Sequence, residues 1–168
     1  WAMAKDTAFK KRGDDYALKT DLRTLPSDYY QSEQIYREEI DKVFYKRWLL
    51  ALRSEEIPNP GDFQTLPFGE ENLILTRGDD GKVRAFFNVC RHRGTRMCVE
   101  DKGCFKSKKI GCPYHAWSYG LKGELQAAPI MDKNKGFDKS KFSLFEAATH
   151  EWEGFVFINL DEDPMPFE

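Results

Sequence analysis

Two short motifs, each pairing a cysteine with a histidine, constrain this chain more than any other feature of its sequence. The first motif contains Cys90 and His92 and ends at Gly94; the second contains Cys112 and His115 and begins after 19 intervening residues. Thiolate and imidazole groups are common ligands of transition metals in proteins. We therefore expect two loops that face one another and share a metal centre.

The order of the ligands favours a cluster of two irons over a single zinc ion. A Rieske-type 2Fe-2S cluster takes two cysteines on one iron and two histidines on the other. Zinc also binds two cysteines and two histidines, but zinc fingers usually place the two cysteines in one motif and the two histidines in another. We expect Cys90 and Cys112 to hold the inner iron, and His92 and His115 the outer, exposed iron. A zinc-stabilised interaction module is one alternative.

Such a ligand set indicates electron transfer. Neutral imidazoles lower the negative charge on the outer iron, so the reduction potential lies above that of a cluster held by four cysteines. We expect the chain to carry electrons and to contain no catalytic residue of its own.

Composition limits the other classes of function. The chain has 168 residues, enough for one packed domain with an appended segment, and its net charge of −2 implies no nucleic-acid or membrane partner. We find no signal-peptide core and no run near the ~18 apolar residues of a membrane span, so we expect a cytoplasmic protein. In that compartment Cys98 and Cys104 are expected to be free thiols.

The hydrophobic pattern divides the chain into three parts. Residues 1–47 are expected to form an N-terminal arm, to about residue 27, and an amphipathic helix of about four turns from Ser32 to Trp48. Residues 48–160 contain strand-like runs at 48–52, 73–76, 83–89 and 155–160, separated by turn sequences. They predict a mainly β fold, an antiparallel sandwich or partly open barrel, with both ligand motifs at hairpin tips.

The residues around the ligands resemble a known family. The stretches 88–94 and 112–119, with Gly123, are similar to the Rieske domain at the N-terminus of the large (alpha) subunit of aromatic-ring-hydroxylating, Rieske non-haem iron oxygenases. The resemblance extends over residues 28–160. It implies a 2Fe-2S domain that takes electrons from a reductase or ferredoxin and passes them to a mononuclear non-haem iron. It also implies contact with a catalytic domain of the same or a neighbouring subunit, and a homotrimer.

The mononuclear iron of that family is held by two histidines and one carboxylate. Only His150 remains once His92 and His115 are assigned, so we expect oxygenation to take place outside this chain. Residues 161–168 then read as the start of a linker to a missing catalytic domain. A free-standing Rieske ferredoxin is the other alternative, and the sequence indicates no organic substrate.

Neighbours of the ligands suggest further properties. Respiratory-type Rieske proteins have a serine two residues after the second histidine; here that residue is Trp117, so we expect a potential in the lower part of the Rieske range. Trp117, Tyr119 and Trp152 are expected to fill the core. Residues 91–109 contain seven basic and two acidic side chains, either a solvated loop or a surface that steers an acidic redox partner.

Overall fold

The computed structural model describes residues 24–167, which fall into two units divided after Tyr36. The first unit contains helix α2 (Asp28–Gln31) and the start of helix α3 (Glu33–Lys42). The hydroxyl oxygen of Ser32 accepts a hydrogen bond from the Ile35 N–H at 3.4 Å, as expected of a helix cap. Most of the predicted arm lies outside the described residues. No described helix has the length and hydropathy to cross a membrane.

Helix α3 is shorter than the sequence pattern predicts. It ends at Lys42 and is followed by the 3₁₀ turn η1 (Phe44–Lys46), whereas we expected one helix to Trp48. The reason is tertiary: the Tyr45 hydroxyl donates to the Phe68 carbonyl at 3.5 Å and accepts from the Glu70 N–H at 3.2 Å. These bonds turn the chain toward the hairpin that contains Phe68 before it enters the first strand.

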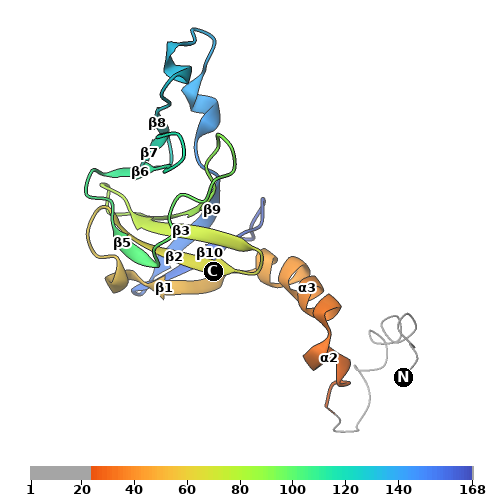
Figure 1. Ribbon diagram of the computed structural model, residues 1–168. Helices are drawn as coiled ribbons and strands as arrows, with labels where there is room; N and C mark the ends of the chain where they lie inside the picture. The colour runs from red at the N-terminus through yellow and green to blue at the C-terminus, as the bar shows by residue number, and fades with distance from the viewer. Residues whose placement is uncertain (1–23, 168) are drawn as a thin grey trace. The chain divides into compact units, whose positions relative to one another are not determined.

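Seven antiparallel strands form one curled sheet, a half-barrel that confirms the predicted mainly β fold (Figure 1). In order across the sheet these are β1 (Leu49–Arg53), β10 (Phe155–Asn159), β9 (Glu146–Trp152), β4 (Val83–Phe87), β3 (Glu71–Arg77), β2 (Asp62–Phe68) and β5 (Lys102–Cys104). The first strand in sequence, β1, thus pairs with the last strand, β10.

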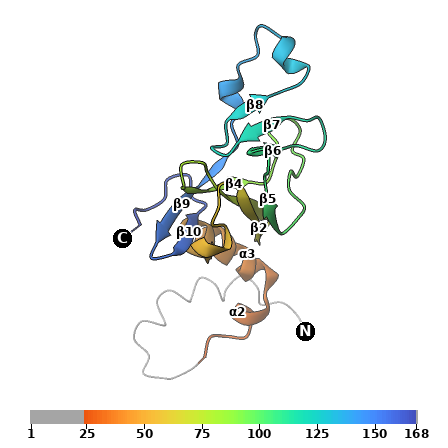
Figure 2. The ribbon, with the colours of Figure 1, turned by 90° about the vertical axis from the view of Figure 1, so that its left-hand side faces the viewer.

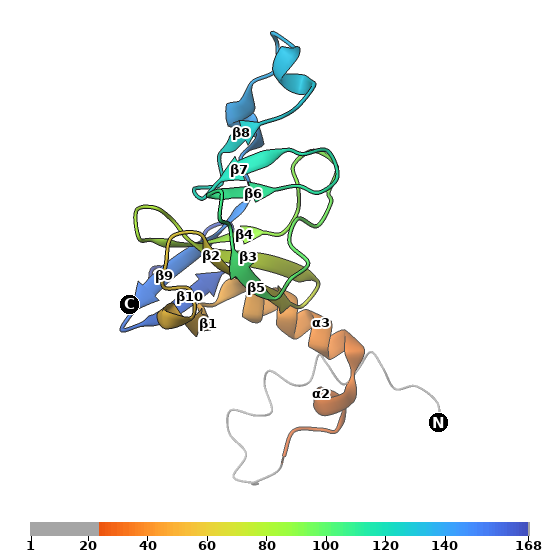
Figure 3. The same ribbon diagram turned by 60° about the vertical axis from the view of Figure 1, so that its left-hand side comes forward.

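A smaller antiparallel sheet follows the first ligand motif. It consists of β6 (Lys109–Gly111), β7 (Ser118–Gly120) and β8 (Leu125–Ala127), and it lies on one side of the larger sheet (Figures 2 and 3). The chain returns to β9 through two 3₁₀ turns, η3 (Met131–Lys133) and η4 (Lys139–Phe142).

The interior strand β3 separates two hydrophobic cores, because successive side chains of a strand point to opposite faces. Leu73 and Leu75 enter the barrel core, and Ile74 enters the second core, which we name the loop-side core; all three are fully buried. The barrel core comprises Leu52, Ile57, Leu73, Leu75, Val83, Ala85, Ala147, Val156 and Ile158. The loop-side core comprises Phe63, Ile74, Phe86, Cys90, Met97, Cys98, Ile110, Cys112, Trp117, Tyr119, Leu125, Ala128 and Leu144.

A buried arginine closes the end of the barrel core. The Arg77 side chain donates to the carbonyls of Ile57 at 3.0 Å and Gly81 at 2.8 Å, and to both oxygens of Ser54. It also pairs with the Glu151 carboxylate at 3.0 Å, and the Ser54 hydroxyl donates to the same carboxylate. One guanidinium therefore joins the turns after β1 and β3 to the end of β9.

Candidate metal centre

The first ligand loop, residues 90–95, follows strand β4 and is closed by two backbone hydrogen bonds. The Cys90 N–H donates to the Thr95 carbonyl at 2.9 Å, and the Gly94 N–H donates to the Cys90 carbonyl at 2.9 Å. Gly94 has a φ of 69°, in the left-handed region that glycine adopts without strain. The expected hairpin is absent here, since the chain continues to β5, which pairs with β2 rather than with β4.

The second ligand loop, residues 112–117, repeats this construction at the tip of the β6–β7 hairpin, as expected. The Cys112 N–H donates to the Trp117 carbonyl at 2.7 Å, and the Ala116 N–H donates to the Cys112 carbonyl at 3.1 Å. Ala116 has a φ of 56° at the position that Gly94 takes in the first loop. Both loops therefore present a cysteine at their first residue and a histidine inside the turn, in matching geometry.

The cysteines of the two loops are buried together in the loop-side core. Cys90 is 2% exposed and Cys112 is 4% exposed. Burial raises the pKa of the Cys90 thiol, and the neighbouring Cys112 thiol raises it further. A metal bound here would displace the Cys90 proton, because the thiolate is the ligand.

The histidines face one another beside the cysteines. The rings of His92 and His115 lie 4.7 Å apart between centroids, at 72°. Their Nδ1 atoms are two of only three buried side-chain polar atoms that lack a hydrogen-bond partner within the described residues. Buried polar atoms are normally paired, so two orphaned ring nitrogens at one place point to a missing ligand. Burial lowers the pKa of His92, which favours the neutral imidazole that metals bind.

Aromatic rings cover the histidines. The indole of Trp117, itself 2% exposed, stacks on the His92 ring at 4.8 Å and 9°. The Tyr114 ring lies 3.7 Å from the His115 ring between centroids. Trp117 thus belongs to the core, as predicted, and also packs flat against the His92 ring. Trp152 does not: it is 55% exposed at the β9–β10 turn, and its predicted core position is wrong.

Tyr119 has a role that the sequence did not reveal. It is fully buried in strand β7, as expected, but its hydroxyl oxygen lies 3.3 Å from the Cys90 sulfur and accepts the Arg91 N–H at 3.1 Å. Either the thiol or the hydroxyl can donate in this contact, and once Cys90 is a thiolate only the Tyr119 hydroxyl can donate. Burial raises the pKa of Tyr119, so the hydroxyl stays protonated. The signal for this contact was its position four residues after His115.

The comparison with known protein families decides the identity of this centre. Residues 47–145 match the model of the Rieske [2Fe-2S] domain. This chain belongs to the Rieske [2Fe-2S] domain family.

Similar proteins are oxygenase subunits, in agreement with the resemblance found in the sequence. The oxygenase subunit of glycine betaine monooxygenase from Pseudomonas aeruginosa is 38% identical over 95% of this chain and 35% of that protein. The alpha subunit of biphenyl 2,3-dioxygenase from Rhodococcus jostii is 35% identical over 89% of this chain and 33% of that protein. The chain thus spans about a third of the length of these relatives.

A solved structure shows the same architecture. The quaternary ammonium Rieske monooxygenase CntA, in complex with L-carnitine, superposes with a TM-score of 0.77 at 38% identity. The match covers 84% of this chain and 40% of that chain. The half-barrel with its smaller sheet is therefore the Rieske fold.

Two further cysteines, Cys98 and Cys104, and the third histidine, His150, were also named from the sequence. Cys98 and Cys104 are free, as expected, and burial raises the pKa of the Cys98 thiol to about 12. His150 stacks on Phe167 at 4.1 Å and contacts the Trp48 ring. These aromatic contacts pack residues of the predicted linker segment against the Rieske domain, and they place His150 in a structural role.

The basic segment 91–109 divides into two groups. Three members are tied to the protein: Arg91 donates to the Ser143 carbonyl at 2.6 Å, Arg96 to the Cys98 carbonyl at 3.1 Å, and Lys108 to the Pro60 carbonyl at 2.6 Å. The other four are Arg93, Lys102, Lys106 and Lys109, and all seven basic residues except Arg91 are exposed. These hydrogen bonds orient three of the seven side chains, but six of the seven remain accessible to a partner.

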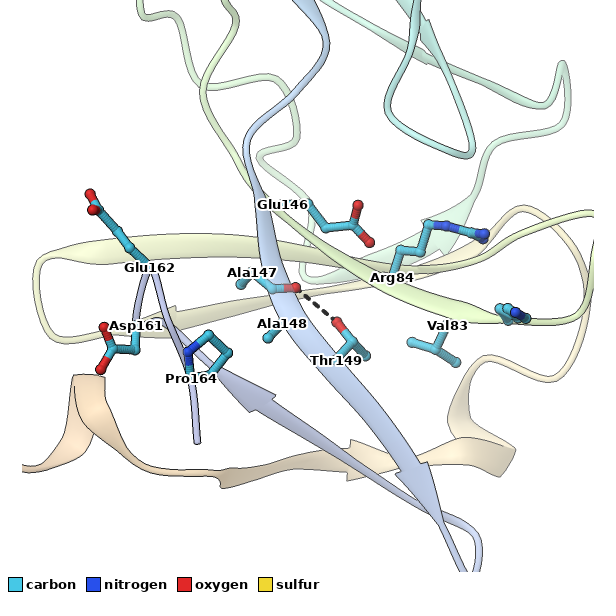
Figure 4. A pocket seen from close by; sticks show the side chains of 10 residues that line it. Val83, Arg84, Glu146, Ala147, Ala148, Thr149, Asp161, Glu162 and Pro164 are labelled. Carbon is cyan, nitrogen blue, oxygen red and sulfur yellow. Dashed lines mark hydrogen bonds between the residues drawn. The ribbon is translucent and has the colours of Figure 1, made fainter. Parts of the chain in front are cut away.

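A cavity of about 490 Å³ lies at strands β4 and β9, apart from the ligand loops (Figure 4). Its wall carries Arg84 and Glu146 on one side and the carboxylates of Asp161 and Glu162 on the other. None of the four predicted ligands lines it. The cavity is thus separate from the metal centre.

Proposed function

We propose that this chain is the electron-transfer domain of a Rieske non-haem iron oxygenase, with the cluster held by Cys90, Cys112, His92 and His115. The observation that carries the proposal is the pair of orphaned, buried Nδ1 atoms beside two buried thiols. The cysteines lie deeper than the histidines, so they suit the inner iron, and the histidines suit the outer one.

The spacing of the donors supports two irons over one zinc ion. The two buried cysteines form one pair of donors, and the two partly exposed histidines form another. A tetrahedral zinc site needs four donors at about 2.0–2.3 Å from one point. Two sulfide-bridged irons span a larger distance, with the cysteine pair at one end and the histidine pair at the other.

The bound cluster supplies one-electron chemistry, and the protein sets its environment. The two buried cysteines keep one end of the centre away from water, while the half-exposed histidines bring the other end to the surface. Tyr119 directs its hydroxyl hydrogen to the Cys90 sulfur, and Trp117 covers the His92 ring. Electrons therefore enter and leave on the histidine side.

The proposal extends to the partners. A reductase or ferredoxin delivers electrons, and an acidic one would be attracted by the exposed Arg93, Lys102, Lys106 and Lys109. The electrons then pass to a mononuclear iron in a catalytic domain of the same or a neighbouring subunit, in a homotrimer acting in the cytoplasm. The relatives named above are oxygenase subunits, which favours this proposal over a free-standing ferredoxin.

The reaction class follows from the relatives, and it is oxygenation of an organic substrate. One relative is named for glycine betaine and another for biphenyl, at nearly equal identity to this chain. The proposal therefore assigns the class of reaction and no particular substrate.

Spectroscopy of the purified 168-residue chain tests the assignment. We expect a red-brown protein that contains iron and sulfide, takes up one electron per chain and gives a rhombic EPR signal when reduced. Metal analysis is done on the same sample. A colourless, EPR-silent chain containing stoichiometric zinc refutes the proposal.

Replacing Tyr119 with phenylalanine is expected to lower the reduction potential. The hydroxyl bond to the Cys90 sulfur strengthens when the reduced cluster gains negative charge, so its loss disfavours reduction. A difference of about 1 kcal/mol in this bond corresponds to about 40 mV for one electron. Potentiometric EPR titration measures the shift. The matched control is Tyr114→Phe, at an exposed ring on His115, which should leave the potential unchanged; equal shifts in both variants contradict the assignment.

A further inference from the structure

We propose that Asn88 is a positioning residue that closes the segment 88–98 around the first ligand loop and so holds Cys90 and His92 in place. This inference rests on the proposed function, because it assigns those two residues as ligands. Asn88 itself lies two residues before Cys90 and directly after strand β4 ends at Phe87.

The side chain of Asn88 forms four hydrogen bonds. Its Oδ1 accepts the backbone N–H groups of Met97 at 3.0 Å and Cys98 at 2.9 Å. Its Nδ2 donates to the Cys98 carbonyl at 2.7 Å and to the Asn72 Oδ1 at 2.7 Å. An asparagine amide has two donors and one oxygen with two lone pairs, so every capacity is used. Asn88 is 1% exposed, so water does not compete for these hydrogen bonds.

These bonds join the two ends of the segment that carries the ligand loop. Asn88 and Cys98 are ten residues apart, and the closed ring of residues 90–95 lies between them. The side-chain bonds of Asn88 thus form an outer closure around the backbone ring of residues 90–95. Without it, the segment would gain the conformational freedom of an open loop, and Cys90 and His92 would move with it.

The closure is also anchored to the most buried strand. The Asn88 N–H donates to the Asn72 carbonyl at 2.7 Å, and the two side-chain amides are bonded as well. Asn72 belongs to β3, whose next five residues are all buried. The base of the loop is therefore bonded to a buried strand, and such support can hold a ligand within a fraction of an ångström.

A second buried asparagine provides a matched control. Asn159, at the end of β10, is fully buried, and its Oδ1 accepts the Asp161 N–H at 2.9 Å. That bond spans two residues and forms a local turn away from the ligands. Replacing Asn159 with aspartate therefore buries a carboxyl group in place of an amide without altering a ligand loop.

The test compares Asn88→Asp and Asn159→Asp in the cluster-loaded chain. Asn88→Asp keeps the accepting oxygen but places a carboxylate oxygen against two acceptors, the Asn72 Oδ1 and the Cys98 carbonyl. We expect cluster release to a chelator to become faster by about tenfold or more, the rhombic EPR signal to broaden, and amides 97 and 98 to exchange faster. Asn159→Asp should lower the unfolding midpoint, but the rate of cluster release should stay within about twofold of the wild-type rate and the EPR signal should not change.

The contrary result is equally specific. If Asn88→Asp lowers the unfolding midpoint as Asn159→Asp does, but leaves release, EPR signal and exchange unchanged, Asn88 is only structural and the inference is wrong. If Asn88→Asp does not fold, the wild-type chain decides: exchange of amides 97 and 98 as fast as in an open loop overturns the inference. Zinc in the wild-type chain refutes the proposed function instead, and the exchange of amides 97 and 98 still tests the closure.

Discussion

Changing Cys112 to serine is expected to remove the visible absorption and the EPR signal of the purified protein completely. The Cys112 side chain is buried between the ligand loop and the loop-side core, and serine offers a hard, weakly acidic oxygen in place of a thiolate. Iron and sulfide content per chain, measured with the absorption spectrum, should fall from about two of each to near zero.

The control for this change is Cys98→Ser. Cys98 is as buried as Cys112, at 4% exposure for both, and lies in the same core. Its thiol has a pKa of about 12 and takes no part in the proposed centre. We expect Cys98→Ser to cost about 1 kcal/mol in stability and to retain the cluster. Loss of the cluster in Cys98→Ser with retention in Cys112→Ser would overturn the ligand assignment.

Changing Arg77 to methionine is expected to lower the free energy of unfolding by about 3 kcal/mol. Methionine fills much of the same space, but it leaves the carbonyls of Ile57 and Gly81 without their donor, and the Glu151 carboxylate without its partner. The partly exposed Glu151 can regain water, which limits the cost. Chemical denaturation followed by circular dichroism measures the change.

The control for Arg77 is an arginine with an exposed ion pair. Arg53 pairs with Glu55 at 2.8 Å, and both side chains are more than half exposed. Because solvent screens such a pair, Arg53→Met should change the free energy of unfolding by less than about 1 kcal/mol. Equal losses in the two variants would show that the buried network around Arg77 does not stabilise the end of the barrel core.

Most of the candidate site was predictable because its ligands are local in sequence. A cysteine and a histidine two or three residues apart must share one turn, so each pair is visible without any knowledge of the fold. The strands at 48–52, 73–76, 83–89 and 155–160 were also predicted, since they carry enough apolar and β-branched residues to show a pattern. They correspond to β1, β3, β4 and β10.

The other strands gave too weak a signal. β5, β6, β7 and β8 have three residues each, which is shorter than the roughly four to eight residues over which alternation can be recognised. β2 contains Pro67, which argues against a strand, and β9 mixes polar residues with small ones. Pairing with neighbours formed these strands, and pairing is not encoded within any one of them.

The sequence by itself determined the ligand types, their spacing, the mainly β fold and, through the resemblance, the family. Only the tertiary structure decided which atoms meet: the Tyr119 hydroxyl and the Cys90 sulfur, and the Asn88 amide with the backbone of residues 97 and 98. It also ended helix α3 early and left Trp152 exposed. The physical reason is that ligand identity is a property of single residues, whereas a hydrogen bond across a core depends on where two distant segments are packed.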